Sequence, residues 1–62
     1  MKEKVIEKVK QDIEMNKILI GYLEEQKKSL PKDKAAQIDI KIEQLQKEIM
    51  FNEGFVDYAS KI

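Results

Sequence analysis

One proline, Pro31, divides the chain between two stretches of regularly spaced apolar residues. In the first stretch these residues lie three and four positions apart, and polar side chains at Asn16 and Lys27 interrupt the series. Its apolar members are Ile6, Val9, Ile13, Ile20, Leu23 and Leu30. The second stretch repeats the spacing at Ala35, Ile38, Ile42, Leu45, Ile49, Asn52, Val56 and Ala59. We call all these positions, Asn16 and Lys27 included, the seam, because the spacing is typical of a helix that packs along another helix.

The position of the proline predicts a turn between two antiparallel helices. Pro31 cannot donate a backbone hydrogen bond, and its ring disfavours the helical conformation at Leu30. The break is short, which favours neighbouring antiparallel helices over two separate domains. We therefore predict an all-α fold, a single antiparallel two-helix hairpin of the coiled-coil type. Its first helix covers about 3–29, the turn about 30–33 and the second helix about 34–60.

Two details of the second helix have alternative interpretations. Asp33 either caps the helix or lies in its first turn, where its charge complements the helix dipole. Gly54 either lies within a continuous helix or ends it, with Phe55 folding back onto Met50 in a Schellman motif. The seam spacing passes through to Val56, which favours the continuous helix.

The composition indicates that a single hairpin needs reinforcement. A chain of 62 residues buries a smaller fraction of its surface than a large domain does. Small domains are often stabilised by disulfides, metals or partner subunits, and this chain has neither Cys nor His. Association is therefore the expected reinforcement. The 12 Lys residues balance the 12 Asp and Glu residues, so no net field attracts the chain to nucleic acid or acidic membranes.

Apolar residues outside the seam form a second set, which includes every Phe and Tyr. At 100° per residue, most of them lie about 130° from the seam, in the same rotational sense on both helices. In an antiparallel hairpin, equal rotation brings both groups to one side. We call this set the apolar flank; it consists of Met15, Ile18, Leu19, Tyr22, Ile40, Phe51, Phe55, Tyr58 and Ile62.

The apolar flank is a predicted interface. Exposed apolar surface of several hundred Å² usually marks a contact with another molecule. The simplest completion is a homodimer that pairs flank with flank in a four-helix bundle. The alternatives are a different protein on the same flank, or a monomer in which these residues are ordinary surface hydrophobes.

Two asparagines, Asn16 and Asn52, occupy seam positions. A buried Asn in a helical seam usually costs stability and fixes the register or the oligomeric state. In the register expected from the turn, Asn16 lies opposite Ile49 and Asn52 lies opposite Ile13. We predict that both set the register. The alternatives are simple exposure to solvent and a polar pocket for a small ligand.

The residues that enzymes use are absent or isolated. Ser29 and Ser60 are the only hydroxyl nucleophiles besides tyrosine, and no His is present to activate them. The carboxylates alternate with lysines at positions expected to face solvent, whereas acid–base catalysis needs a perturbed group. Two separate glycines do not make a phosphate-binding loop. We predict no catalytic residue, no cofactor and no metal site, and hence a protein that is not an enzyme.

These features predict a small non-enzymatic interaction module, a regulator or adaptor that binds itself and a larger cytoplasmic protein through a helix face. One alternative is a nucleic-acid-associated regulator that uses lysines presented by a dimer; a second is a purely structural assembly element. The longest apolar run, at residues 18–20, is far shorter than the roughly 20 residues that span a bilayer. The charged start of the chain does not resemble a secretory signal, so a cytoplasmic location is expected.

Overall fold

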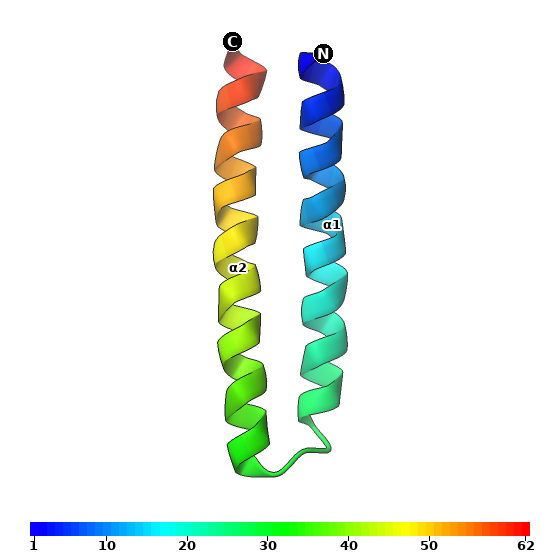
Figure 1. The fold of residues 1–62 in the computed structure, drawn as a ribbon, viewed down its shortest axis with the longest axis vertical. Helices are drawn as coiled ribbons and strands as arrows, with labels where there is room; N and C mark the ends of the chain where they lie inside the picture. Colours follow the sequence, from blue (N-terminus) through cyan, green and yellow to red (C-terminus); the bar gives the residue numbers. More distant parts are fainter.

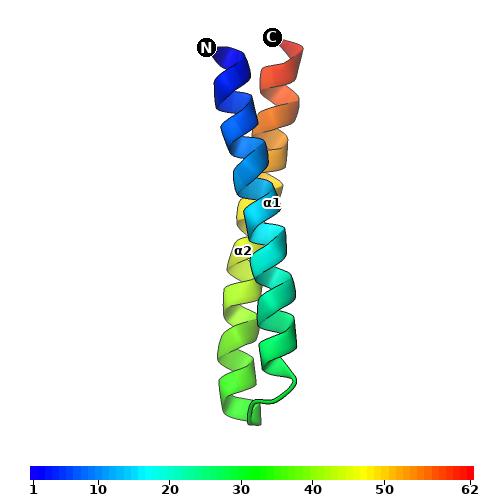
Figure 2. The same ribbon diagram turned by 90° about the vertical axis from the view of Figure 1, so that its right-hand side faces the viewer.

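The chain folds into two antiparallel helices in a computed structural model that describes residues 1–62. Helix α1 covers Lys2–Lys27 and helix α2 covers Lys32–Lys61. The helices lie side by side over the full 47 Å length of the molecule, and both chain ends lie at the same end (Figure 1). A second view shows the two helices crossing at a shallow angle, as in coiled coils (Figure 2). The predicted all-α helical hairpin is therefore confirmed.

The seam supplies the whole interior of the hairpin. Every side chain that is not exposed is a seam residue, and Lys27 is the only seam residue that is exposed. Four of them are buried, namely Ile13, Ile42, Leu45 and Ala59, each with between 5% and 8% of its surface exposed. The remaining members are half-buried, because two helices alone cover each side chain from one direction only. The core is thus a single row of side chains between two rods.

Helix α1 ends at Lys27, earlier than the predicted end near residue 29. The next three backbone N–H groups donate to carbonyl oxygens three residues earlier, at 3.2–3.3 Å. This is the tighter 3₁₀ pattern that often ends an α-helix. The reason is the proline: because Leu30 precedes Pro31, it is driven out of the helical conformation and the last turn tightens before it.

Helix α2 begins at Lys32, earlier than the predicted start near residue 34. Pro31 has φ −61° and ψ 159°, and its carbonyl oxygen accepts a 2.8 Å hydrogen bond from the N–H of Ala35. Pro31 is therefore the residue at the helix boundary, and the helix begins directly after it. Asp33 makes no side-chain capping bond and lies in the first turn, where its carboxylate complements the positive end of the helix dipole.

Helix α2 continues through Gly54 to Lys61. Neither Gly54 nor Gly21 has a positive φ, so no left-handed residue interrupts either helix. A methyl group added at either glycine would meet no atom within 4 Å. The structure thus has the continuous form of α2, and Phe55 extends the helix instead of folding back onto Met50.

Candidate interaction surface

The apolar flank lies outside the core on exposed positions of both helices. All nine predicted residues are exposed. Their exposed fractions range from 37% for Phe55 to 77% for Phe51. Leu19 and Phe55 are the least exposed of them because they border the seam. Large apolar side chains exposed in this number on one small hairpin form the candidate interaction surface.

The opposite side of the hairpin carries charged residues close to the seam. There the ammonium group of Lys17 lies 3.9 Å from the carboxylate of Glu53 and links α1 to α2. Met50 is the one large apolar side chain on this side, and it is 72% exposed. Met50 and Phe51 are adjacent in sequence and lie on opposite sides of the seam, about 130° from it in opposite senses. The apolar flank therefore lies on one side, with Ile18 and Ile40 at its outer margin, about 180° from the seam.

The apolar residues are unevenly distributed along the hairpin. In the antiparallel register, Phe55, Tyr58 and Ile62 of α2 lie near the chain ends. Met15 of α1 and Phe51 of α2 lie at nearly the same height, near the middle. Towards the turn, the same side of the hairpin carries the polar residues Gln26, Ser29, Lys34, Gln37 and Lys41, with Ile40 as the one large apolar residue among them.

Two apolar residues extend the flank beyond the set predicted from the sequence. Val5 is 50% exposed and Met1 is almost fully exposed, on the same side of α1 as Leu19. They extend the apolar surface of α1 to the chain ends, next to Ile62. The missed signal was the spacing: Met1, Val5, Met15, Leu19 and Tyr22 share one face of α1, interrupted only by Lys8 and Asp12.

Asn16 makes a polar contact between the helices from its seam position. The side-chain amide of Asn16 donates a 3.2 Å hydrogen bond to Oε2 of Glu48. Glu48 is adjacent to Ile49, the residue expected opposite Asn16. Asn52 is half-buried at its seam position, and no buried side-chain polar atom in the structure lacks a partner.

Two of the four lysines between residues 27 and 34 are paired with neighbouring carboxylates. The ammonium group of Lys27 lies 2.7 Å from Oδ1 of Asp39 on α2, and that of Lys28 lies 3.4 Å from Glu25. The other two, Lys32 and Lys34, flank Asp33 in the sequence and make no ion pair. The contacts of Lys27 and Lys28 thus offset part of the positive charge that a phosphate-binding surface would concentrate at the turn.

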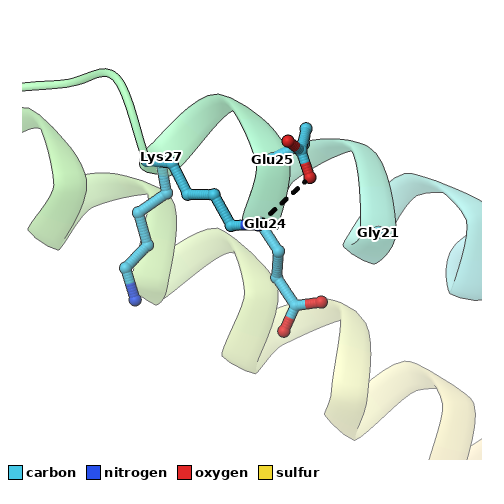
Figure 3. Close-up of a pocket in the computed structure, with 5 residues that line it drawn as sticks. Gly21, Glu24, Glu25 and Lys27 are labelled. Atoms are coloured by element: carbon cyan, nitrogen blue, oxygen red, sulfur yellow. Dashed lines mark hydrogen bonds and ion pairs between the residues drawn. The ribbon is translucent and has the colours of Figure 1, made fainter.

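A shallow depression at the end of α1 is the one pocket of the structure. Its lining residues are Gly21, Glu24, Glu25, Lys27 and Lys28, and none of them is hydrophobic. Figure 3 shows Lys27 extending towards α2, where its ammonium group meets Asp39, and marks the contact of Glu25 with a dashed line. Ligand pockets usually combine an apolar lining with a few polar groups in an enclosed space. This depression has neither property.

No chemical site emerges from the remaining polar residues. The hydroxyl of Ser29 donates to the carbonyl oxygen of Gln26 in the turn, at 3.2 Å. No three Asp or Glu side chains are grouped closely enough to hold a metal ion. Neither α1 nor α2 has the length and hydropathy that a bilayer-crossing helix requires. The apolar flank is the surface with the clearest physical consequence.

Comparison with protein-family models, with curated proteins and with solved structures finds no match for this chain. The apolar flank is therefore the feature from which a function can be inferred.

Proposed function

We propose that this protein is a small non-enzymatic interaction module that acts by packing its apolar flank against other helices. The observation that carries the proposal is the set of nine exposed apolar residues on one side of a hairpin whose interior is already filled by the seam. Such residues lose contact with water only when another molecule covers them, and burying apolar area is the main favourable term in protein association.

The first partner in this proposal is a second copy of the chain, which completes a homodimeric four-helix bundle. The hairpin exposes 5139 Å², whereas a compact monomer of 7.3 kDa exposes about 4,200 Å². The excess of roughly 900 Å² is close to the roughly 800 Å² that each partner contributes to a standard interface. The excess exists because two rods have no third element to cover the flank, and a second hairpin supplies that element.

The composition of the flank also supports an interface. Its nine residues include both Phe and both Tyr residues, together with Met15. Aromatic residues and methionine are enriched in the cores of interfaces, and lysine and glutamate are depleted there. A larger protein that offers an apolar helix groove would use the same chemistry, which is how a regulator or adaptor of this size would act.

Sedimentation velocity over a concentration series tests the proposal. We expect a species of twice the 7.3 kDa chain mass that dissociates on dilution. A 7.3 kDa species at every concentration would contradict self-association. Growth beyond a dimer with increasing concentration would instead indicate a structural assembly element.

A further inference from the structure

The uneven distribution of the apolar flank determines how two copies can pair. Three of its four aromatic residues, Phe51, Phe55 and Tyr58, lie in the half of the hairpin next to the chain ends, whereas Tyr22 lies past the middle towards the turn. The same side becomes polar near the turn, where Gln37 and Lys41 are exposed. When two such faces pack together, the favourable orientation is the one in which the apolar half contacts the partner's apolar half and the polar half contacts the partner's polar half.

We propose that the two hairpins of the dimer pair in the same direction, with both turns at one end and all four chain ends at the other. This inference rests on the self-association proposed above. The two-fold axis of this dimer runs parallel to the long axis of the hairpins, so that α1 of one protomer lies against α2 of its partner. Every pair of neighbouring helices in the bundle is then antiparallel, as in the usual four-helix bundles.

The same-direction arrangement brings apolar residues of similar height together. Met15 lies against the partner's Phe51, and by symmetry Phe51 lies against the partner's Met15, so four side chains form one layer in the middle of the bundle. Sulfur–aromatic contacts of this kind are favourable. Near the chain ends, Val5 lies against the partner's Ile62. Four exposed apolar residues of each hairpin are thus covered by residues of the partner.

The charged residues of α1 within the flank are compatible with this arrangement. Lys8 and Asp12 lie at the height of the partner's Tyr58 and the partner's Phe55. Their charges are 3.7 Å apart and partly neutralise each other. Lysine can also cover an aromatic ring with its aliphatic stem while its ammonium group stays in water. The rings are therefore covered without burying an isolated charge.

The opposite orientation places unlike halves together. With the two hairpins fully overlapped and reversed, α2 lies against the partner's α2, and Tyr58 and Phe55 face the partner's Gln37 and the partner's Lys41. Burying those polar groups without partners is unfavourable. The alternative of sliding the hairpins apart until only the aromatic halves overlap leaves Leu19 and Tyr22 largely uncovered.

Repulsion between the two turns does not outweigh this preference. The turn lysines Lys27 and Lys28 are already paired with Asp39 and Glu25. Exposed charges that remain are screened by salt over about 10 Å at 0.1 M ionic strength. Salt weakens the repulsion between the turns but does not weaken the burial of the aromatic half. Burial of apolar surface therefore decides the orientation.

Distances between spin labels test the orientation. The chain has no Cys, so Ser29→Cys in the turn and Ser60→Cys near the chain end each introduce one labelling site per copy. Both positions are exposed, and neither is one of the nine flank residues; Ser29 lies at the polar end of the flank side and Ser60 on the opposite side. Packed helices lie about 10 Å apart. We therefore expect a label-to-label distance far shorter than the 47 Å hairpin in each variant, measured by pulsed electron paramagnetic resonance.

Each outcome has a definite meaning when sedimentation of the labelled protein is measured in parallel. Short distances in both variants support the same-direction dimer. A dimeric mass with label distances comparable to 47 Å in both variants overturns the orientation and leaves the dimer intact. A monomeric mass with no intermolecular distance overturns both the orientation and self-association, so the two failures are distinguishable.

Discussion

The amide group of Asn16 donates a 3.2 Å hydrogen bond to the carboxylate of Glu48 across the two helices. This contact lies at the edge of the row of apolar seam residues, with Ile13 and Ile20 above and below it in α1. The hydrogen bond gives the side-chain amide of Asn16 a partner. An apolar residue at this position would need none. The predicted role of Asn16 in fixing the alignment of the two helices stays a prediction, and the contact is compatible with it.

Replacing that asparagine tests the alignment role. We expect Asn16→Leu to raise the free energy of unfolding by about 1 kcal/mol. Leucine adds buried apolar surface, and this gain exceeds the small net contribution of the lost hydrogen bond. We also expect a broader distribution of oligomeric states. Urea unfolding followed by circular dichroism measures the first effect, and sedimentation equilibrium measures the second. A less stable variant with one defined mass would contradict the register assignment.

The flank assignment is tested by two adjacent residues of nearly equal exposure. Phe51→Glu removes a buried aromatic from each copy of the proposed dimer, worth about 1.5–3 kcal/mol per side chain. We expect the dissociation constant of the dimer to rise at least about 100-fold. The matched control is Met50→Glu, because Met50 is 72% exposed and Phe51 77%, but on opposite sides of the seam. Equal effects of the two variants, measured by sedimentation equilibrium, would show that the flank is not the interface.

The double variant Phe51→Glu, Phe55→Glu tests whether folding depends on assembly. A single hairpin retains only the row of seam residues as its core, so loss of the dimer should also reduce helicity at low protein concentration. Circular dichroism at 222 nm, recorded over a dilution series, measures this effect. A double variant that stays dimeric and fully helical would refute the proposed interface.

The continuity of α2 at Gly54 is tested by alanine. Both glycines have helical backbone conformations and open space around the missing side chain. We therefore expect Gly54→Ala to stabilise the hairpin by about 0.5–1 kcal/mol, since glycine costs this much in a helix interior. Gly21→Ala is the control within α1 and should have the same effect. A decrease in thermal stability for Gly54→Ala alone would indicate a left-handed break at that residue.

The turn ion pair should contribute little. Lys27→Glu replaces the 2.7 Å contact with Asp39 by repulsion between two exposed carboxylates. Exposed ion pairs contribute about 0–1 kcal/mol, so we expect a decrease in stability of roughly that size and an unchanged sedimentation coefficient. Raising the salt concentration should reduce the difference from the wild type. Dissociation of the dimer in this variant would place the interface at the turn.

The sequence predicted the interior of the hairpin well because burial follows the helical period. Each half-buried or buried residue is a seam position, and the nine flank residues are all exposed in the single chain. The helix ends were predicted less accurately. They depend on hydrogen bonds of individual backbone groups, such as the one from Ala35 to Pro31, which the apolar spacing does not encode. The homodimer stays a prediction.

The polar contacts between the helices were not predicted. Lys17 and Glu53 meet because both lie beside the seam on the charged side, yet many other pairs of long side chains satisfy the same spacing. Val5 was missed for a different reason. It follows three charged residues and directly precedes the seam residue Ile6, and it is recognised as part of the flank only when the whole face of α1 is followed to the chain ends.

The single row of side chains between α1 and α2 has a consequence for how the protein opens. Since even Leu45, the least exposed side chain, keeps 5% of its surface open to solvent, the free hairpin has no deep nucleus that holds its two ends together. It should unzip progressively from the free ends towards the turn, and its amide protons should exchange with solvent along a gradient instead of in one cooperative step.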